Sequence, residues 1–274
     1  MKIANYQIEK TYDIFPTSQG ELWPLRRIDT YPISINDIQD KVVKVSFYRC
    51  PIANRRDVFK QSKCIMPISV GQNLKVHEGE KFLATMKLIN NSFKSCALLI
   101  DDSIQRHTMK IQSDLPAKAL HAKAVMTGDD WLNDNKYIYE QLTIPYTIIR
   151  WDDWLTHPNF EGYYELVCNL YERDNQYQEA FHNTIEGFIA RYKNKVEATL
   201  FNYNRAYKCC VKYLKEECAV MCLWADEGYN FEVYPSGRNE AMKATYERIV
   251  LSRHPNLLVS VSLHFKNLKK SILI

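Results

Sequence analysis

The segment Lys63-Cys64-Ile65-Met66-Pro67-Ile68-Ser69 begins the regular part of this sequence. Its short apolar run ends at a polar loop that contains Gly71, which is typical of a buried β-strand. Pro67 has no backbone N–H to donate, so we expect it at the edge of the sheet or at the end of the strand. The segment therefore predicts a strand that presents Ser69 at its carboxyl end.

Strand-like and helix-like segments alternate along the chain after this point. Strands are predicted at residues 95–100, 143–151, 229–234 and 257–265, and a short one at 42–47. Helices are predicted at residues 80–90, 116–126, 160–172, 176–194, 199–225 and 239–251. This alternation predicts an α/β fold with a largely parallel sheet flanked by helices. We assign residues 63–274 to a single domain and residues 1–62 to an N-terminal extension packed on its core.

The composition excludes some classes of function. Of 274 residues, 36 are basic and 32 acidic, and the net charge of +4 is too small to indicate nucleic-acid binding by the whole surface. Only 8 residues are glycine, and every two of them are at least eight positions apart. Dinucleotide-binding and P-loop motifs need clustered glycines, because the backbone must close on phosphate. Both kinds of nucleotide site are therefore excluded.

The eight cysteines do not indicate a disulfide scaffold or a zinc site. They lie mainly in apolar runs such as Cys218-Ala219-Val220-Met221-Cys222, where thiols behave as small hydrophobic groups. No two have the C-x-x-C spacing of zinc ligands. The N-terminus has no apolar signal core, and the longest apolar run, 218–225, is far shorter than the ~20 residues of a membrane span. We expect a reducing, cytoplasmic location and no membrane partner.

Parallel sheets bind ligands at the carboxyl ends of their strands, which here are the loops at 69–73, 101–106 and 234–237. A nucleophilic serine needs exposure at such an end and a group that takes its proton, and Ser69 has the right position. The hydrolase motif G-x-S-x-G is not met, because Pro67 replaces its first glycine. The alternative is that Ser69 is an ordinary turn or cap residue.

The helix predicted around residues 204–224 places Tyr213 and Glu217 on one face, about 40° apart. A basic stripe that includes Lys208 and Lys212 lies on the far side and faces solvent. Glu217 is therefore drawn toward the interior, where a carboxylate must be paired, hydrogen-bonded or protonated. It either bonds to Tyr213 for structure or anchors a substrate ammonium group.

Two further strand ends allow a functional and a structural interpretation. Tyr234, before Pro235, is either a proton relay or a packed aromatic residue before a turn. Asp101-Asp102 is either a magnesium site or the start of a turn or helix, and we favour the second. We expect no metal.

Taken together, the strand-end serine, the pair Tyr213-x-x-x-Glu217 and the later Tyr234-Pro235 resemble the tRNA-dependent cyclodipeptide synthases. The resemblance is to the subgroup with Tyr-Pro where other members have Tyr-His. It extends over about residues 63–265 and includes two supporting segments. These are Asp102-Ser103-Ile104-Gln105-Arg106-His107 and Ile149-Arg150-Trp151-Asp152-Asp153-Trp154.

The resemblance implies a Rossmann-like fold similar to the catalytic domain of class Ic aminoacyl-tRNA synthetases, without ATP binding or amino-acid activation. The implied enzyme is an aminoacyltransferase that joins the amino acids of two aminoacyl-tRNAs into a cyclic dipeptide. Because aminoacyl-tRNA is already an activated ester, no cofactor is required. A covalent intermediate would give ping-pong kinetics. The implied partners are two tRNA substrates and no DNA, and we expect a monomer.

The resemblance also implies roles for single residues. Ser69 would receive the first aminoacyl group, Tyr213 and Glu217 would hold its ammonium, and Glu217 would move protons as the second amine attacks. Tyr234 would assist ring closure, while Gln72 would occupy the position that is asparagine in the other subgroup. Pro67 and Pro235 would be substrate-binding residues beside these groups.

Pro67 departs from the family pattern. The family has glycine there, whose backbone helps to position the acyl carbonyl, and proline has no N–H to donate. Either the N–H of Val70 or Gly71 serves instead, or the assignment of this loop is shifted.

Phosphate contacts to tRNA require local basic charge. The candidate tRNA-binding residues are Lys118, Lys123, Arg205, Lys208 and Lys212, with a further basic cluster at 49–63. The alternative for each is a solvated face. Two other functions stay open: a tRNA-independent serine acyl hydrolase or transferase, and a non-catalytic tRNA-binding module.

Overall fold

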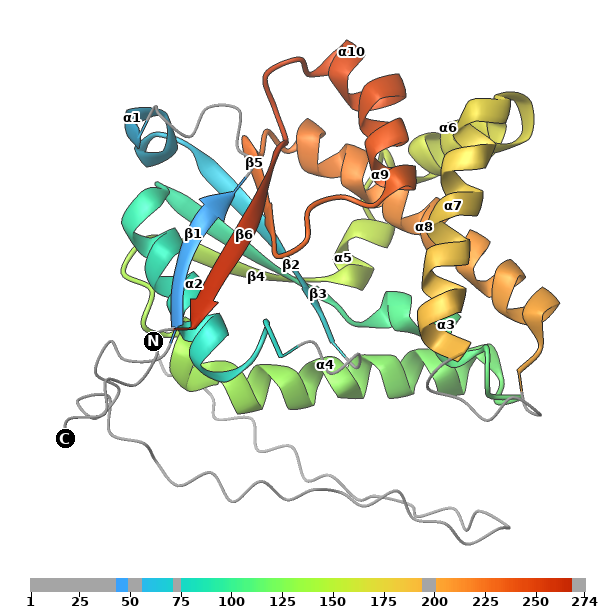
Figure 1. The fold of residues 1–274 in the computed structure, drawn as a ribbon, viewed down its shortest axis with the longest axis horizontal. Coiled ribbons are helices and arrows are strands. Elements are labelled where there is room, and N and C mark those ends of the chain that lie inside the picture. The colour runs from blue at the N-terminus through green and yellow to red at the C-terminus, as the bar shows by residue number, and fades with distance from the viewer. Residues whose placement is uncertain (1–42, 49–55, 71–74, 194–200, 268–274) are drawn as a thin grey trace, which may run out of the picture. The chain divides into compact units, whose positions relative to one another are not determined.

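The computed structural model describes residues 43–48, 56–70, 75–193 and 201–267 (Figure 1). These residues belong to one compact unit, Asp40–Ile274. Gln72 and most of the predicted N-terminal extension lie outside the described residues. Residues 43–48 and 56–60 of that extension belong to the same unit, and its boundary at residue 62 stays a prediction.

The described residues form one six-stranded sheet in the order β1-β6-β5-β2-β3-β4. Neighbouring strands are parallel except β1 and β6, which are antiparallel. The predicted α/β fold with a largely parallel sheet is thus confirmed. The strands are β1 (Val43–Tyr48), β2 (Lys63–Ser69), β3 (Ser95–Asp101), β4 (Tyr146–Arg150), β5 (Phe231–Tyr234) and β6 (Val259–Asn267).

Helices flank the sheet, and all six predicted long helices are present with shifted ends (Figure 1). The helix predicted at 116–126 continues to Tyr139, and the one predicted at 239–251 contains a π-helical turn. The helical elements are α1 (Arg56–Lys60), α2 (Gly79–Ser92), η1 (Ser103–Gln105), α3 (Arg106–Met109), α4 (Ala117–Tyr139), α5 (Trp151–Leu155), α6 (Phe160–Arg173), α7 (Asn175–Lys193), α8 (Tyr203–Asp226), α9 (Glu240–Thr245), η3 (Tyr246–Val250) and α10 (Leu251–Arg253).

The long helix α8 is the centre of the core. Its residues 218–225 are all buried, because α6, α7 and α9 pack around it. Ile65 of β2 and Leu99 of β3 belong to the same core cluster. A helix that is apolar on every side must be enclosed, so the longest apolar run of the sequence is the middle of this core.

Pro67 does not lie at an edge of the sheet, so that alternative was wrong, but it does lie near the end of its strand, two residues before Ser69. It is buried in β2, which lies between β5 and β3, and it pairs in register with Leu99. The pairing of β2 with β5 covers Cys64 and Ile65. Because β2 has separated from β5 before Pro67, the missing N–H removes no hydrogen bond on that side.

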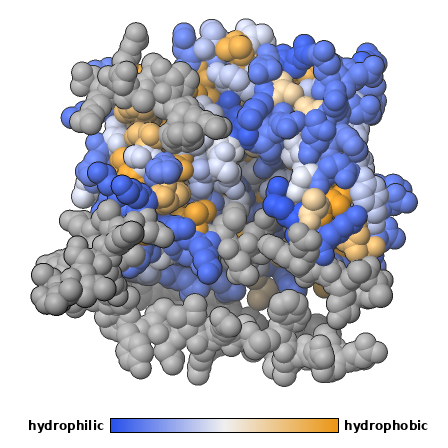
Figure 2. Space-filling view, in the orientation of Figure 1, coloured by the Kyte–Doolittle hydropathy of each residue, from blue (hydrophilic) through white to orange (hydrophobic). Residues whose placement is uncertain are grey.

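Among the described residues, no helix combines the length and the apolar character needed to cross a bilayer. On the face in Figure 2, outside the grey atoms, hydrophilic residues predominate and apolar residues lie in small groups.

Candidate active site

The strand order creates a crevice beside β2. The chain runs from β2 outward to β3 and β4 and then returns to place β5 on the other side of β2. Ligands of open α/β sheets bind where the strand order reverses in this way. Here the crevice holds a cavity of about 210 Å³, beyond the point at which β2 and β5 separate. Its lining includes Pro67, Ser69, Asp101, Tyr213, Glu217, Glu232, Tyr234 and Asn239.

Ser69 and Tyr234 meet across the crevice. The Ser69 Oγ and Tyr234 hydroxyl oxygen are 3.1 Å apart and share a hydrogen bond. Burial raises the pKa of the Tyr234 phenol above its ordinary value, although the bond to Ser69 opposes this. Tyr234 is therefore a neutral phenol that can exchange a proton with the serine hydroxyl.

His77 holds the same serine through its backbone, a contact that no sequence pattern indicated. The Ser69 N–H donates to His77 Nδ1 at 3.2 Å. Burial lowers the pKa of His77 to about 4, so the ring is neutral and its proton is on Nε2. The ring also lies edge-on to Tyr234, with centroids 5.7 Å apart. His77 thus positions Ser69 and packs against its hydroxyl partner.

Glu217 lies in the cavity wall, as the helical spacing predicted, with Tyr213 beside it. Asn239 Nδ2 donates to Glu217 Oε2 at 3.1 Å. Burial raises the pKa of Glu217 to about 7, against the hydrogen bonds from Asn239 and Tyr213. Glu217 has no ion-pair partner among the described residues, so its carboxyl can bind a cation or exchange a proton near neutral pH.

Asp101 is a cavity residue that the sequence suggested only as part of a turn or metal site. It ends β3 and pairs in register with Ser69 of β2. Its side chain is buried, and its Oδ1 has no hydrogen-bond partner in the described structure. Burial, and then the charge of Glu217, raise its pKa well above the ordinary range.

Glu232 completes the acidic lining but is neutralised. Arg238 Nε donates to Glu232 Oε2 at 2.6 Å, and both side chains are buried. The turn between them requires Gly237, which has φ +72° and would place a Cβ 2.7 Å from Ser262 Oγ. This turn keeps Arg238 on Glu232, so the uncompensated carboxyls of the lining are Asp101 and Glu217 among the described residues.

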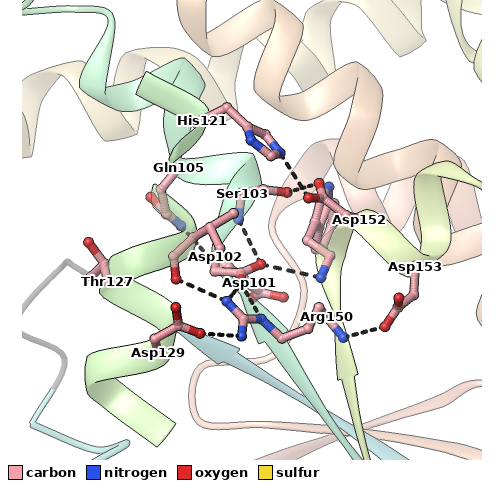
Figure 3. Close-up of polar contacts among 12 residues, drawn as sticks. Asp101, Asp102, Ser103, Gln105, His121, Thr127, Asp129, Arg150, Asp152 and Asp153 are labelled. Atoms are coloured by element: carbon pink, nitrogen blue, oxygen red, sulfur yellow. Dashed lines mark hydrogen bonds and ion pairs between the residues drawn. The ribbon is translucent and has the colours of Figure 1, made fainter. Parts of the chain in front are cut away.

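Asp102 is not among the residues that line the cavity, and its contacts organise the strand ends (Figure 3). It accepts hydrogen bonds from the backbone of Ser103 and Trp151, and it forms an ion pair with Arg150. The two segments singled out from the sequence, 102–107 and 149–154, therefore contact one another here. Asp102 starts a turn, as we favoured. No cluster of three or more His, Cys, Asp or Glu with metal-binding geometry occurs within the described ranges.

The predicted tRNA-binding residues lie outside the cavity on two helices. Lys118 and Lys123 are exposed on α4, and Lys208 and Lys212 are exposed on α8. Arg205 is half-buried and pairs with Asp114 at 2.8 Å, so it is not a solvated member of the predicted stripe. It joins the start of α8 to the loop before α4, donating to the carbonyls of Lys110 and Ser113.

Of the remaining predicted site residues, Pro67 lies in the cavity wall, and Pro235 does not, although its neighbours Tyr234 and Ser236 do. The cavity also has residues that the sequence analysis did not single out. Arg191, near the end of α7, is exposed at its rim, and Ile185, Phe188, Leu214 and Met242 supply apolar wall.

Comparisons with known proteins give one consistent answer. No family model matches the chain, and no curated protein matches it. A CDPS (cyclodipeptide synthase) from Fluoribacter dumoffii is 48% identical, with a TM-score of 0.78, over 82% of this chain and 99% of that chain.

Two more distant structures share the fold. A cyclodipeptide synthase from Candidatus Glomeribacter gigasporarum, bound to Phe-tRNAPhe, is 19% identical over 74% of this chain and 88% of that one, with a TM-score of 0.62. A Mycobacterium tuberculosis protein is 9% identical over 82% of this chain and 93% of that one, with a TM-score of 0.56. Its structure is described as demonstrating that cyclodipeptide synthetases are related to type I tRNA synthetases.

The fold, with its strand-end residues gathered at the switch point, is therefore shared with these solved structures. The Fluoribacter dumoffii similarity spans almost the whole of that protein at 48% identity. The chain belongs to the cyclodipeptide synthase family.

Proposed function

We propose that this enzyme joins the amino acids of two aminoacyl-tRNAs into a cyclic dipeptide, with Ser69 as the covalent carrier. The observation that supports this most is the hydrogen bond between Ser69 Oγ and the Tyr234 hydroxyl, in a cavity that also contains Glu217. A relative with the same fold has been seen with Phe-tRNAPhe. The Tyr234-Pro235 pair supports membership of the Tyr-Pro subgroup.

In the first step, Ser69 Oγ attacks the ester carbonyl of the first aminoacyl-tRNA. An aminoacyl-serine ester forms, and the serine proton passes to the 3′-oxygen of the departing tRNA. One ester replaces another, so the step needs no nucleotide. Glu217 holds the ammonium group of the bound residue, with Tyr213 beside it, and this fixes the acyl group for the next step.

In the second step, the serine-bound amine loses a proton to Glu217 and attacks the second aminoacyl-tRNA. The second proton of that nitrogen passes to the 3′-oxygen of the second tRNA, which departs and leaves a dipeptide esterified to Ser69. The free terminal amine then attacks the serine ester, the ring closes, and Tyr234 helps to return a proton to Ser69 Oγ. Because the first tRNA departs before the second reacts, the kinetics are ping-pong.

The contact between the Ser69 N–H and His77 reduces the number of backbone N–H groups in this loop that could bind the oxyanion. Pro67 has no N–H, and the Ser69 N–H already donates to His77 Nδ1. The N–H of Val70 or Gly71 is the candidate that remains in this loop, and Gln72 next to it stays a predicted substrate-binding residue outside the described structure.

The test is incubation of the enzyme with tRNA charged with each of the twenty amino acids, with mass analysis of the products. We expect a cyclic dipeptide and a labelled enzyme whose mass increases by one aminoacyl group. Ser69→Ala should abolish both, while Ser236→Ala, on the same rim, should keep the label. No cyclic dipeptide from any amino acid would contradict the proposal.

The same experiment separates the alternative functions. A tRNA-independent acyl hydrolase or transferase would act on small activated esters without the steep salt dependence of phosphate contacts. A non-catalytic module would retain tRNA on a gel and never form an acyl-enzyme.

A further inference from the structure

We propose that Asp101 is a further catalytic residue, the group that accepts the proton from the terminal ammonium of the serine-bound dipeptide before the ring closes. This rests on the proposed function and adds a step-specific role to a residue outside the set Ser69, Tyr213, Glu217 and Tyr234. This role is supported by the position of Asp101 beside Ser69, by the unpaired Oδ1 of its side chain, and by the number of protons the reaction must move.

The position of Asp101 follows from the strand register. β2 and β3 are parallel, and Ser69 and Asp101 are paired at their last residues. Both side chains line the same cavity. A hydrogen bond from the Ser69 side chain lowers the pKa of Asp101, against the larger effect of burial, so the two side chains are in contact. Any amine that attacks the carbonyl on Ser69 must therefore come near Asp101.

The surroundings of Asp101 leave a place for a proton donor. The residue is only 5% exposed, and its Oδ1 has no hydrogen-bond partner within the described structure. Buried carboxyl oxygens are normally hydrogen-bonded, so an unpaired one in a cavity wall indicates a bond that a ligand completes. An ammonium group is a suitable ligand, because it donates protons and its charge offsets the neighbouring Glu217.

The reaction needs two proton acceptors of this kind. Each amino acid enters as an ammonium and must become an amine before it attacks. The first amine is on the residue attached to Ser69, within reach of Glu217. The second is on the terminal residue of the dipeptide and must lie against the ester carbonyl at Ser69, beside Asp101.

The closing step then balances in atoms and protons. Burial and the charge of Glu217 keep Asp101 protonated at rest, and it releases that proton to solvent when the positively charged ammonium binds beside it. The terminal ammonium then gives one proton to the Asp101 carboxylate, and the amine nitrogen forms a bond to the ester carbon. The bond from that carbon to Ser69 Oγ breaks, and the second proton of the nitrogen passes to Oγ through the Tyr234 hydroxyl. Asp101 thereby returns to its protonated resting form. Glu232 cannot replace Asp101, because Arg238 occupies it.

The test is intact-protein mass spectrometry of Asp101→Asn during turnover with aminoacyl-tRNA. Asparagine keeps the size of the side chain but does not accept a proton. We expect Ser69 to be acylated at near the wild-type rate, the dipeptidyl-enzyme to accumulate, and cyclic dipeptide to form at least tenfold more slowly. Asp130→Asn, which removes an exposed carboxylate outside the cavity, should behave as wild type.

A second variant keeps the proposal testable if Asp101→Asn is unstable. In Asp101→Ala, formate can enter the space left by the side chain and supply a carboxylate. We expect formate, but not chloride at the same concentration, to accelerate decay of the dipeptidyl-enzyme. Cyclisation at the wild-type rate in Asp101→Asn, a block at acylation instead, or no response to formate would overturn the role of Asp101. A wild-type enzyme that forms no acyl-enzyme would instead contradict the proposed function.

Discussion

Two adjacent glutamates on α8 have opposite surroundings. Glu216 is buried and accepts hydrogen bonds from Trp151 Nε1 at 2.7 Å and from Arg106, with His107 Nε2 at 3.1 Å. Burial alone would raise its pKa, but the bond to His107 and the charge of Arg106 outweigh burial and lower the pKa. For Glu217, burial prevails and raises the pKa to about 7. Glu216 therefore stabilises the fold when it is ionised, and Glu217 does so when it is protonated.

This contrast predicts opposite effects of the same substitution. The folded pKa of Glu217 is above its unfolded value, so its stabilisation is present at low pH and is lost as the pH rises through about 7. Glu217→Gln should therefore match the wild type near pH 4.5. At pH 8 it should be more stable, by up to about 3 kcal/mol, while losing activity.

Glu216→Gln is the matched control, measured by thermal unfolding at both pH values. The folded pKa of Glu216 is below its unfolded value, so its stabilisation is present above that value and is lost as the pH falls. The variant should lose roughly 3–5 kcal/mol at pH 8, because Arg106 is left without its buried partner. Equal shifts in both variants would show that the two surroundings are not different.

At the scale of elements, α4 is held against the ends of β3 and β4 by polar contacts (Figure 3). Arg150 Nη1 bonds to Asp129 of α4 at 2.8 Å, while another guanidinium nitrogen pairs with Asp102. His121 of α4 bonds to Asp152 at 2.8 Å, and Asp152 also accepts from Ser103. The helix and the strand end beside Asp101 are therefore connected at two places.

Gly128 is the residue of α4 that permits this close approach. A Cβ there would lie 2.7 Å from Asp102 Cβ and 2.8 Å from Arg150 Nη2. We expect Gly128→Ala to lower the free energy of unfolding by about 1–3 kcal/mol, although alanine is the better helix former. Gly162→Ala on α6, which has open space around its Cβ, should instead raise it by about 0.5–1 kcal/mol. Denaturant unfolding measures both, and a stabilised Gly128→Ala would contradict the close contact.

The predicted helices and strands agree with the structure where local periodicity decides the conformation. The helix and strand patterns gave every long helix and five downstream strands to within a few residues or less, apart from the extension of α4 and the late start of β4. The end of α4 was missed because Gly128 is usually unfavourable within a helix. Only its contact with Asp102 and Arg150 shows why a residue without a Cβ is needed there.

At the scale of the whole molecule, the small net charge of +4 means that tRNA binding must depend on local patches. Arg205 joins the start of α8 to the loop before α4. The two candidate tRNA-binding patches, Lys118 with Lys123 and Lys208 with Lys212, therefore lie on adjacent elements. Of these, α4 is tied through His121 and Asp152 to the strand ends beside the cavity.

We therefore expect Lys118→Glu/Lys123→Glu to raise KM for aminoacyl-tRNA at least tenfold and to weaken the salt dependence of activity. The acyl transfer itself should be unaffected at saturating substrate. Lys208→Glu/Lys212→Glu on α8 is the matched comparison, with the same change of charge. Steady-state kinetics at about 50 and 200 mM salt distinguish the two patches. A larger effect of Lys208→Glu/Lys212→Glu would place the tRNA on α8 instead of α4.

The sequence by itself determined the α/β fold, the strand that ends at Ser69, and the shared face of Tyr213 and Glu217. These follow from periods of two and 3.6 residues, which are properties of short segments. Only the tertiary structure decided that β5 lies beside β2, which brings Tyr234 to Ser69 and closes the cavity on Asp101. It also decided that His77 holds Ser69 and that Glu216 is paired while Glu217 is not. Strand order and burial depend on contacts between distant parts of the chain, so no local pattern records them.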